Sequence, residues 1–162
     1  MRILGIGSPF GDDKLGWDAI TALRRSLQES GLIQRLPISL TTCDRPGSSL
    51  LGLMQGAELA VLIDAVSSNL PVGTLVRLQG EQIGAAEGLL SSHDFGVASA
   101  LALAKALNAL PARVVLWGVE VGPITAADAP MRPEIEQAVP RLVAAVTGEV
   151  EEYLAAGGFS EL

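Results

Sequence analysis

The first twenty residues constrain the fold most strongly, because they combine a short apolar strand, a glycine-rich loop and the start of a helix. The pattern predicts a strand at residues 2–6, a loop at residues 7–13 and an amphipathic helix that begins at Leu15. This order is typical of the opening unit of an open α/β sheet. Ligands of such sheets bind outside the carboxyl ends of the strands, so a functional site is expected at the loop that carries Asp12 and Asp13.

The rest of the chain alternates between strand-like and helix-like segments. The continuous apolar run at residues 59–63 indicates a strand buried on both faces, and the alternation at residues 74–79 indicates an edge strand. Strands are predicted at residues 2–6, 38–42, 58–65, 74–79 and 113–119, and helices at 15–30, 48–56, 95–110, a short one from 133 and a last one from 140 to 156. Residues 80–90 are predicted to be a loop. We therefore expect a mainly parallel sheet of about five strands with helices on both faces.

Length and composition exclude several classes of protein. A chain of 162 residues fits one domain, which we expect to span residues 1–162, and it has no apolar run of the ~20 residues that cross a bilayer. The net charge of −7, without a cluster of Lys and Arg, argues against binding to nucleic acid or to an anionic membrane surface. The single cysteine suits a reducing compartment, and no signal peptide is recognisable at the start, so a cytoplasmic location is expected.

Polar residues capable of chemistry follow the predicted strands or precede the helices. Asp13, Asp64, His93 and Glu120 all fall in such loops, and in a parallel sheet these loops share one edge. Two carboxylates and an imidazole are ligands suited to a borderline divalent metal. Each residue also has a simpler interpretation: Asp13 as a helix cap, Asp64 as a partner of loop amides, His93 as part of a capping turn, and Glu120 as a partner of a nearby amide or arginine.

A nucleotide site is an alternative interpretation of the same opening. The glycines at positions 5, 7 and 11 resemble a stretched dinucleotide-binding fingerprint, and Asp44 follows the second strand, where a ribose-binding acid would lie. The two aspartates at the helix start argue against it, because they would repel a pyrophosphate. A hydrolase built on a nucleophile is disfavoured too, since the chain has no Gly-x-Ser-x-Gly motif.

At these positions the sequence resembles the hydrogenase maturation endopeptidases, which trim the C-terminal tail of the NiFe hydrogenase large subunit. The resemblance covers nearly the whole chain and depends on the order and spacing of its pieces. They are Arg2-Ile-Leu-Gly-Ile-Gly7, Asp12-Asp13 followed by Gly16, Leu62-Ile-Asp64-Ala65, Ser91-Ser-His93, Trp117-Gly-Val-Glu120 and Ala138-Val-Pro140.

The resemblance implies a three-layer α/β/α sandwich, with one edge strand antiparallel, and a metal-binding trio of Asp13, Asp64 and His93 that is also catalytic, with Asp12 as an alternative to Asp13. It further implies that the metal is nickel supplied by the substrate, already inserted in a hydrogenase large-subunit precursor, rather than a metal of the protein's own. The two other interpretations that stay open are a nucleotide-binding oxidoreductase and a nonenzymatic hydrogenase assembly partner.

Overall fold

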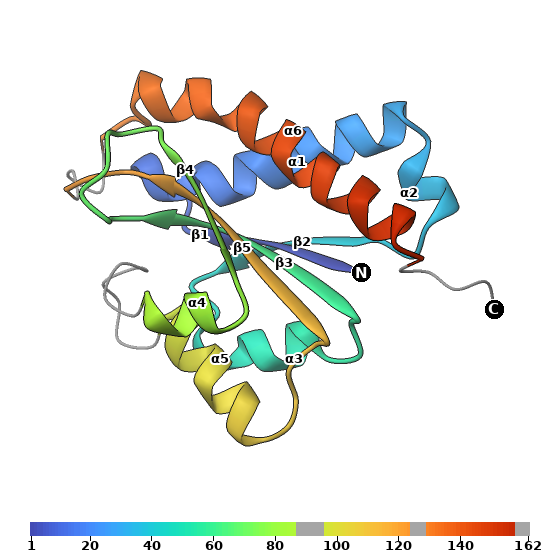
Figure 1. The fold of residues 1–162 in the computed structure, drawn as a ribbon. Coiled ribbons are helices and arrows are strands. Elements are labelled where there is room, and N and C mark those ends of the chain that lie inside the picture. The colour runs from blue at the N-terminus through green and yellow to red at the C-terminus, as the bar shows by residue number, and fades with distance from the viewer. Residues whose placement is uncertain (87–95, 124–128, 158–162) are drawn as a thin grey trace.

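A five-stranded sheet forms the centre of the computed structural model, which describes residues 1–86, 96–123 and 129–157 (Figure 1). In these residues the strand order is β2-β1-β3-β5-β4. Four strands run parallel, and β4 pairs with β5 in the antiparallel direction at one edge. The strands are β1 (Arg2–Gly7), β2 (Ser39–Asp44), β3 (Leu59–Val66), β4 (Leu75–Gln79) and β5 (Arg113–Glu120). The predicted mainly parallel sheet with an antiparallel edge strand is confirmed.

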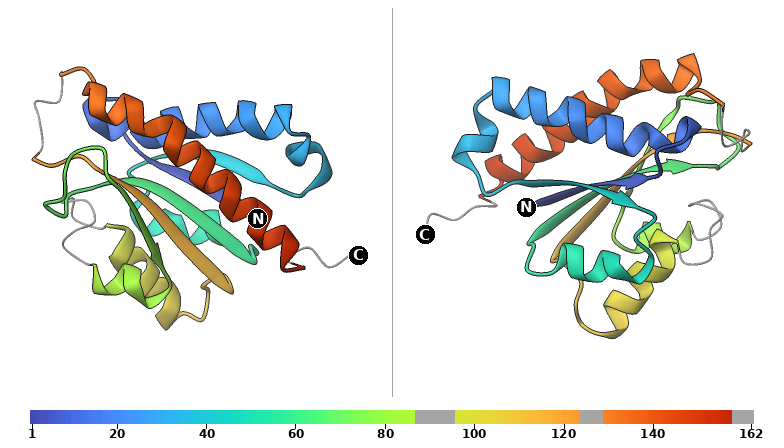
Figure 2. Two further views of the ribbon diagram at one scale, coloured as in Figure 1. Left: turned by 45° about the horizontal axis from the view of Figure 1, so that its top comes forward. Right: turned by 180° about the vertical axis from the view of Figure 1, so that it is seen from behind.

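Helices cover both faces of the sheet (Figures 1 and 2). On one face lie α1 (Leu15–Glu29) and α6 (Pro133–Ala155), with the short α2 (Leu32–Arg35) after α1. On the other face lie α3 (Leu50–Met54), α4 (Glu81–Ala85) and α5 (Val97–Ala106). Two short 3-10 helices, η1 (Gly11–Lys14) and η2 (Gly47–Ser49), follow β1 and β2. The expected three-layer α/β/α arrangement is therefore present.

The buried central strand supplies both halves of the core. Every residue of β3 is buried, and its side chains alternate between the two faces of the sheet. Val61 and Ile63 pack in the cluster beneath α1 and α6, whereas Leu62 packs in the cluster beneath α3 and α5. This two-sided burial explains why the strand reads in the sequence as an uninterrupted apolar run.

Glycines allow α1 to lie directly on β1. A Cβ added to Gly5 would collide with the carbonyl oxygen of Gly16, and a Cβ added to Gly16 would collide with the carbonyl oxygen of Ile6. A Cβ on Gly7 would likewise collide with the carbonyl oxygen of Asp13. The glycines of the opening motif are therefore required by the contact between strand and helix, and this contact sets the position of η1.

The end of the chain departs from the predicted pair of helices. Residues 133–155 form one helix, α6, that continues through Pro140, so the prediction of a new helix at Pro140 is wrong. A proline inside a helix loses one hydrogen bond and costs about 3 kcal/mol. The helix accepts this cost because Ile135, Ala138 and Leu142 are fully buried on either side, and because Pro140 and the freed carbonyl group of Glu136 lie on the exposed side.

The other differences are shorter in extent. The predicted loop at residues 80–90 contains α4 at Glu81–Ala85, which forms because Ile83 is buried beneath it; residues 87–90 lie outside the described ones. The predicted helices at 48–56 and 95–110 are shorter, and α2 was not predicted. None of the helices in the described ranges has the length and apolarity that crossing a bilayer requires.

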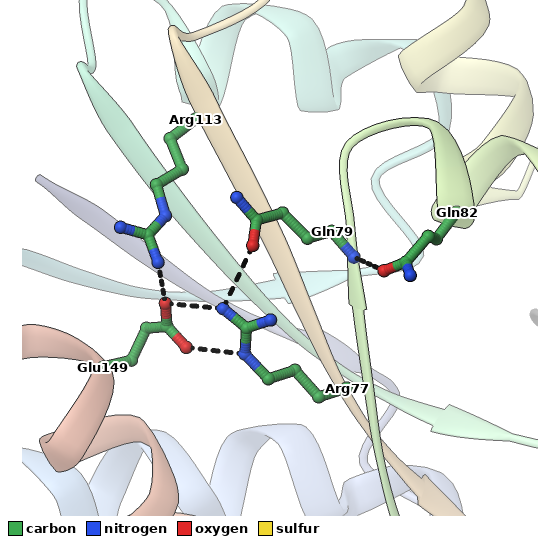
Figure 3. A network of polar contacts seen from close by, with 5 residues as sticks. All are labelled: Arg77, Gln79, Gln82, Arg113 and Glu149. Atoms are coloured by element: carbon green, nitrogen blue, oxygen red, sulfur yellow. Dashed lines mark hydrogen bonds and ion pairs between the residues drawn. The ribbon is translucent and has the colours of Figure 1, made fainter. Parts of the chain in front are cut away.

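Two ion pairs that share the buried carboxylate of Glu149 join α6 to the antiparallel edge of the sheet (Figure 3). The carboxylate of Glu149 accepts hydrogen bonds of 2.9 Å from Nε and Nη2 of Arg77 on β4, and one of 2.7 Å from Arg113 on β5. Burial alone would raise the pKa of Glu149, but hydrogen bonds from Arg77 and the charges of Arg77 and Arg113 outweigh it and hold the pKa below its ordinary value. The ionised carboxylate is therefore part of the folded structure.

We expect Gly16→Ala to destabilise the protein by about 3 kcal/mol or more, because the added methyl group must separate α1 from β1. Gly148→Ala in α6 is the matched control: its Cβ meets no atom within 4 Å, so alanine should stabilise the helix by about 0.5–1 kcal/mol. Urea unfolding followed by circular dichroism measures both. Equal stability of the two variants would contradict the close contact.

Glu149→Gln should lower the free energy of unfolding at pH 7 by about 1–3 kcal/mol, since it leaves two arginines without their carboxylate. Because the folded-state pKa of Glu149 is lowered, its contribution is complete above the ordinary value of 4.5 and is lost as the pH falls through the folded-state pKa. The gap between wild type and variant should therefore narrow in urea titrations below about pH 4.5. A gap that is constant with pH would show that packing, not charge, is lost.

Candidate functional site

A cavity of about 150 Å³ lies at the carboxyl ends of the parallel strands. Gly7 ends β1, Arg45 follows β2, and Asp64 lies two residues before the end of β3. These strand ends, together with η1 and the start of α5, enclose the cavity. Its lining residues are Ile6, Gly7, Asp13, Arg45, Pro46, Gly47, Leu50, Asp64, Gly96 and Val97. The structure thus brings Asp13 and Asp64 together, although they are far apart in the sequence.

Asp64 has one carboxylate oxygen without a partner. The side chain is buried, and its Oδ1 accepts a hydrogen bond of 2.9 Å from the backbone N–H of Ala65. Its Oδ2 is buried and accepts no hydrogen bond from any described residue. Burial, reinforced by the charge of Asp13 and opposed by the Ala65 hydrogen bond, raises the pKa of Asp64 well above its ordinary value. A buried carboxylate oxygen of this kind requires either a proton or a cation.

Asp13 is the second carboxylate of the cavity, and it does not cap a helix. The residues at the cap positions are Phe10 for η1 and Lys14 for α1, and neither helix has a side-chain cap. The backbone carbonyl group of Asp13 accepts a hydrogen bond of 3.3 Å from the N–H of Ser8. The backbone is therefore fixed against the end of β1, and the half-buried side chain is left to the cavity.

Asp12, the alternative ligand, is engaged elsewhere. It is buried, and its Oδ1 and Oδ2 accept hydrogen bonds of 2.8 and 2.6 Å from the backbone N–H and Nε of Arg132. Arg132 also donates to the carbonyl oxygen of Val121. This contact joins η1 to the end of β5 and the start of α6. Because both oxygens of Asp12 are occupied, the geometry favours Asp13 as the residue available for a ligand.

His93 lies outside the described residues, so its place relative to the two carboxylates stays a prediction. Gly96 and Val97, where the described chain resumes and α5 begins, line the cavity. Within the described ranges there is no group of three or more His, Cys, Asp or Glu side chains that could hold a metal. Asp13 and Asp64 alone therefore do not make up the predicted metal-binding trio, and His93 as its third member stays a prediction.

Glu120, the fourth sequence candidate, stabilises loops instead of lining the cavity. It is fully buried at the end of β5 and accepts hydrogen bonds from the N–H and hydroxyl of Ser68, at 2.7 and 2.6 Å, and from the N–H of Gly122 at 2.9 Å. Burial opposes ionisation, but these hydrogen bonds prevail and hold the pKa of Glu120 below its ordinary value. Its simpler interpretation, as a partner of loop amides, is the one that the structure supports.

The geometry disfavours the nucleotide interpretation. The glycines of the opening motif contact the backbone of α1 and η1, and the two acidic side chains in the first turn of η1, Asp12 and Asp13, would repel a phosphate there. Asp44, the predicted ribose-binding acid, pairs with Nε of Arg45 at 2.9 Å. Arg45 and Arg132 were both missed by sequence reasoning, because an arginine beside a turn or before a helix carries no distinctive pattern.

Comparisons with known proteins agree with the sequence resemblance. The family model described as "Hydrogenase maturation protease" matches residues 46–149. The hydrogenase expression/formation protein HupD of Thiocapsa roseopersicina is 30% identical over 159 residues, which cover 96% of this chain and 68% of HupD. Among solved structures, the hydrogenase maturating endopeptidase HybD from E. coli has a TM-score of 0.76 at 22% identity, covering 93% of this chain and 91% of HybD. HybD from Thermococcus kodakarensis has a TM-score of 0.62 at 23% identity, covering 91% and 96%.

We expect Asp64→Asn to make the protein more stable than wild type at pH 7. The raised pKa means that the folded state binds a proton more tightly than the unfolded chain, so wild-type stability falls as the pH rises above the ordinary value of 3.8. The asparagine amide cannot ionise, so the variant does not lose stability as the pH rises. Thermal unfolding between pH 3.5 and 8 measures the effect, and the advantage of the variant should vanish at the acidic end.

Asp18→Asn is the matched control for this change. Asp18 lies on α1 and forms an exposed ion pair with Lys14, so its removal should change stability by less than about 1 kcal/mol at any pH. If Asp64→Asn behaved like Asp18→Asn, burial would not raise the pKa of Asp64 as described above.

Proposed function

The chain belongs to the hydrogenase maturation protease family, and from this membership we propose that it is an endopeptidase that removes the C-terminal tail of a NiFe hydrogenase large-subunit precursor after nickel insertion. In this proposal the nickel is part of the substrate and serves as the recognition element. The protein partner is the precursor itself. The single cysteine of the chain suits the reducing cytoplasm, where we place the reaction.

The unpaired Oδ2 of Asp64 is the observation that carries the proposal. It is a buried oxygen acceptor in a cavity that also holds Asp13, and it gains a partner when a cation enters. Carboxylate oxygens together with an imidazole, which we propose comes from His93, suit a borderline divalent cation such as nickel. Without a cation in the cavity, the two neighbouring carboxylates destabilise the folded protein. With a cation bound between them, the same carboxylates are stabilised. This difference provides the energy by which the protein would tell a loaded precursor from an unloaded one.

The chain's own residues would do two kinds of work. Asp13, Asp64 and His93 hold the metal-bearing part of the precursor, and this holds the tail across the cavity mouth. One carboxylate then serves as the general base that takes a proton from the attacking water; Asp64 suits this task because burial raises its pKa, so its carboxylate binds a proton more tightly than an exposed aspartate does. Nickel bound to the precursor supplies Lewis acidity to the scissile carbonyl or to the water. In an alternative role, the trio only senses the nickel, and a carboxylate then acts as the general base without Lewis-acid help from the metal.

The direct test is the intact mass of a nickel-loaded precursor before and after incubation with the protein, beside a nickel-free precursor. Loss of a C-terminal peptide from the loaded form alone is the expected result. A complex with the precursor that forms without any shortening would instead identify a nonenzymatic assembly partner. Cleavage of both forms would remove nickel from the recognition step.

Variants then test the site. Asp64→Asn should slow processing by at least about 100-fold, the usual contribution of a general base, while Asp18→Asn should process normally. His93→Ala should weaken the binding of loaded precursor without changing the binding of the nickel-free form. Normal tail removal by Asp64→Asn would exclude it from the site, and unchanged binding by His93→Ala would exclude His93.

A further inference from the structure

Arg45 is the one cationic side chain among the described residues that line the cavity. It follows β2 directly, while Asp13 and Asp64 make the rest of the lining acidic. The negative charge of Asp13 extends to the Arg45 guanidinium, although Asp44 is its main partner. One exposed cationic side chain thus shares the cavity with two carboxylates, and Asp44, outside the lining, pairs with it.

The backbone at Arg45 is unusual for a residue with a side chain. Its φ angle is +40°, in the left-handed region that favours glycine, and a 3.1 Å hydrogen bond from its N–H to the carbonyl group of Gly7 holds it there. A glycine could adopt this conformation without strain. An arginine kept in such a conformation beside a cavity indicates that its side chain has a use there.

Within the described structure the Arg45 guanidinium forms a single ion pair, and that pair is exposed. Its Nε donates to Oδ1 of Asp44 at 2.9 Å, and both side chains are about half exposed, at 55% and 51%. Neither Nη atom donates to any residue of the described ranges. Exposed ion pairs of this kind contribute little to stability, so another acceptor can replace Asp44. The planar guanidinium is suited to binding a carboxylate through two nitrogens.

We propose that Arg45 is a specificity-determining residue that binds a carboxylate of the protein substrate, carried by the segment beside the scissile bond. The inference rests on the proposed function and extends it. The guanidinium attracts a substrate carboxylate, while the nickel of the precursor faces Asp13 and Asp64 on the other side of the cavity, so the two contacts together fix the direction in which the segment crosses the site. Asp44 occupies the guanidinium until the substrate arrives.

The test uses the full-length protein and a nickel-loaded precursor, with cleavage measured by intact mass. Arg45→Gln should raise KM about tenfold, the loss expected for one charge-assisted contact, and leave kcat within about threefold. Arg35→Gln is the matched control, an exposed arginine on α2 that should leave both constants unchanged. Arg45→Gly should show the same rise in KM together with a higher melting temperature, because glycine relieves the backbone strain.

A charge exchange identifies the partner group. Precursors are prepared in which the Asp and Glu residues within about five positions of the cut, a reach of about 17 Å, are changed to Lys. Wild type should process them poorly, and Arg45→Glu should process them better than it processes the normal precursor. The inference is wrong if Arg45→Glu does not prefer the Lys-substituted precursors, or if Arg45→Gln changes kcat alone. In either case, cleavage of the normal precursor by wild type leaves the proposed function standing. Absence of wild-type cleavage overturns both.

Discussion

The contact between β1 and α1 is the constraint on which the rest of the structure depends. Gly5 and Gly16 let the two backbones meet without side chains between them, and Gly7 lets η1 fold back against the strand end. This places Asp13 at the edge of the sheet where β2 and β3 also end. Because the two backbones are this close, α1 lies directly against the sheet, and α6 packs beside α1 on the same face. A motif that reads as a nucleotide fingerprint therefore serves packing, and the packing positions the site.

Neighbouring carboxylates at this edge have different environments. Asp12 and Glu120 are buried and fully hydrogen-bonded, so they stabilise the loops that surround the cavity. Asp64 is as deeply buried, yet one of its oxygens has no partner in the described structure. A buried carboxylate that stabilises the fold has hydrogen bonds to both of its oxygens, whereas one that binds a ligand keeps an oxygen available for it. The hydrogen bonds thus divide residues that the sequence alone presents as equivalent candidates.

The sequence predicts those parts of the fold that depend on local pattern. The apolar run of β3 and the alternation of β4 identified the central and edge strands, and their ends define the edge where Asp13 and Asp64 meet. Local pattern does not predict features that depend on residues far apart in the sequence. The helix continues through Pro140 because the core buries its neighbours, and Asp12 is paired with Arg132, 120 positions away. The residues next to Pro140 or Asp12 in the sequence give no sign of either feature. The position of His93 stays a prediction for a different reason, since it lies outside the described residues.

The manner in which Asp13 is held has a consequence for redesign. Its position comes from backbone contacts, with Gly7 beneath it and the N–H of Ser8 bonded to its carbonyl group, and not from any bond of its side chain that the described structure contains. The fold consequently does not need an aspartate there. Glutamate, histidine or cysteine could occupy the position on the same scaffold, so under the proposed function it is the natural place to change which metal ion of a precursor the site accepts, without rebuilding the surrounding loops.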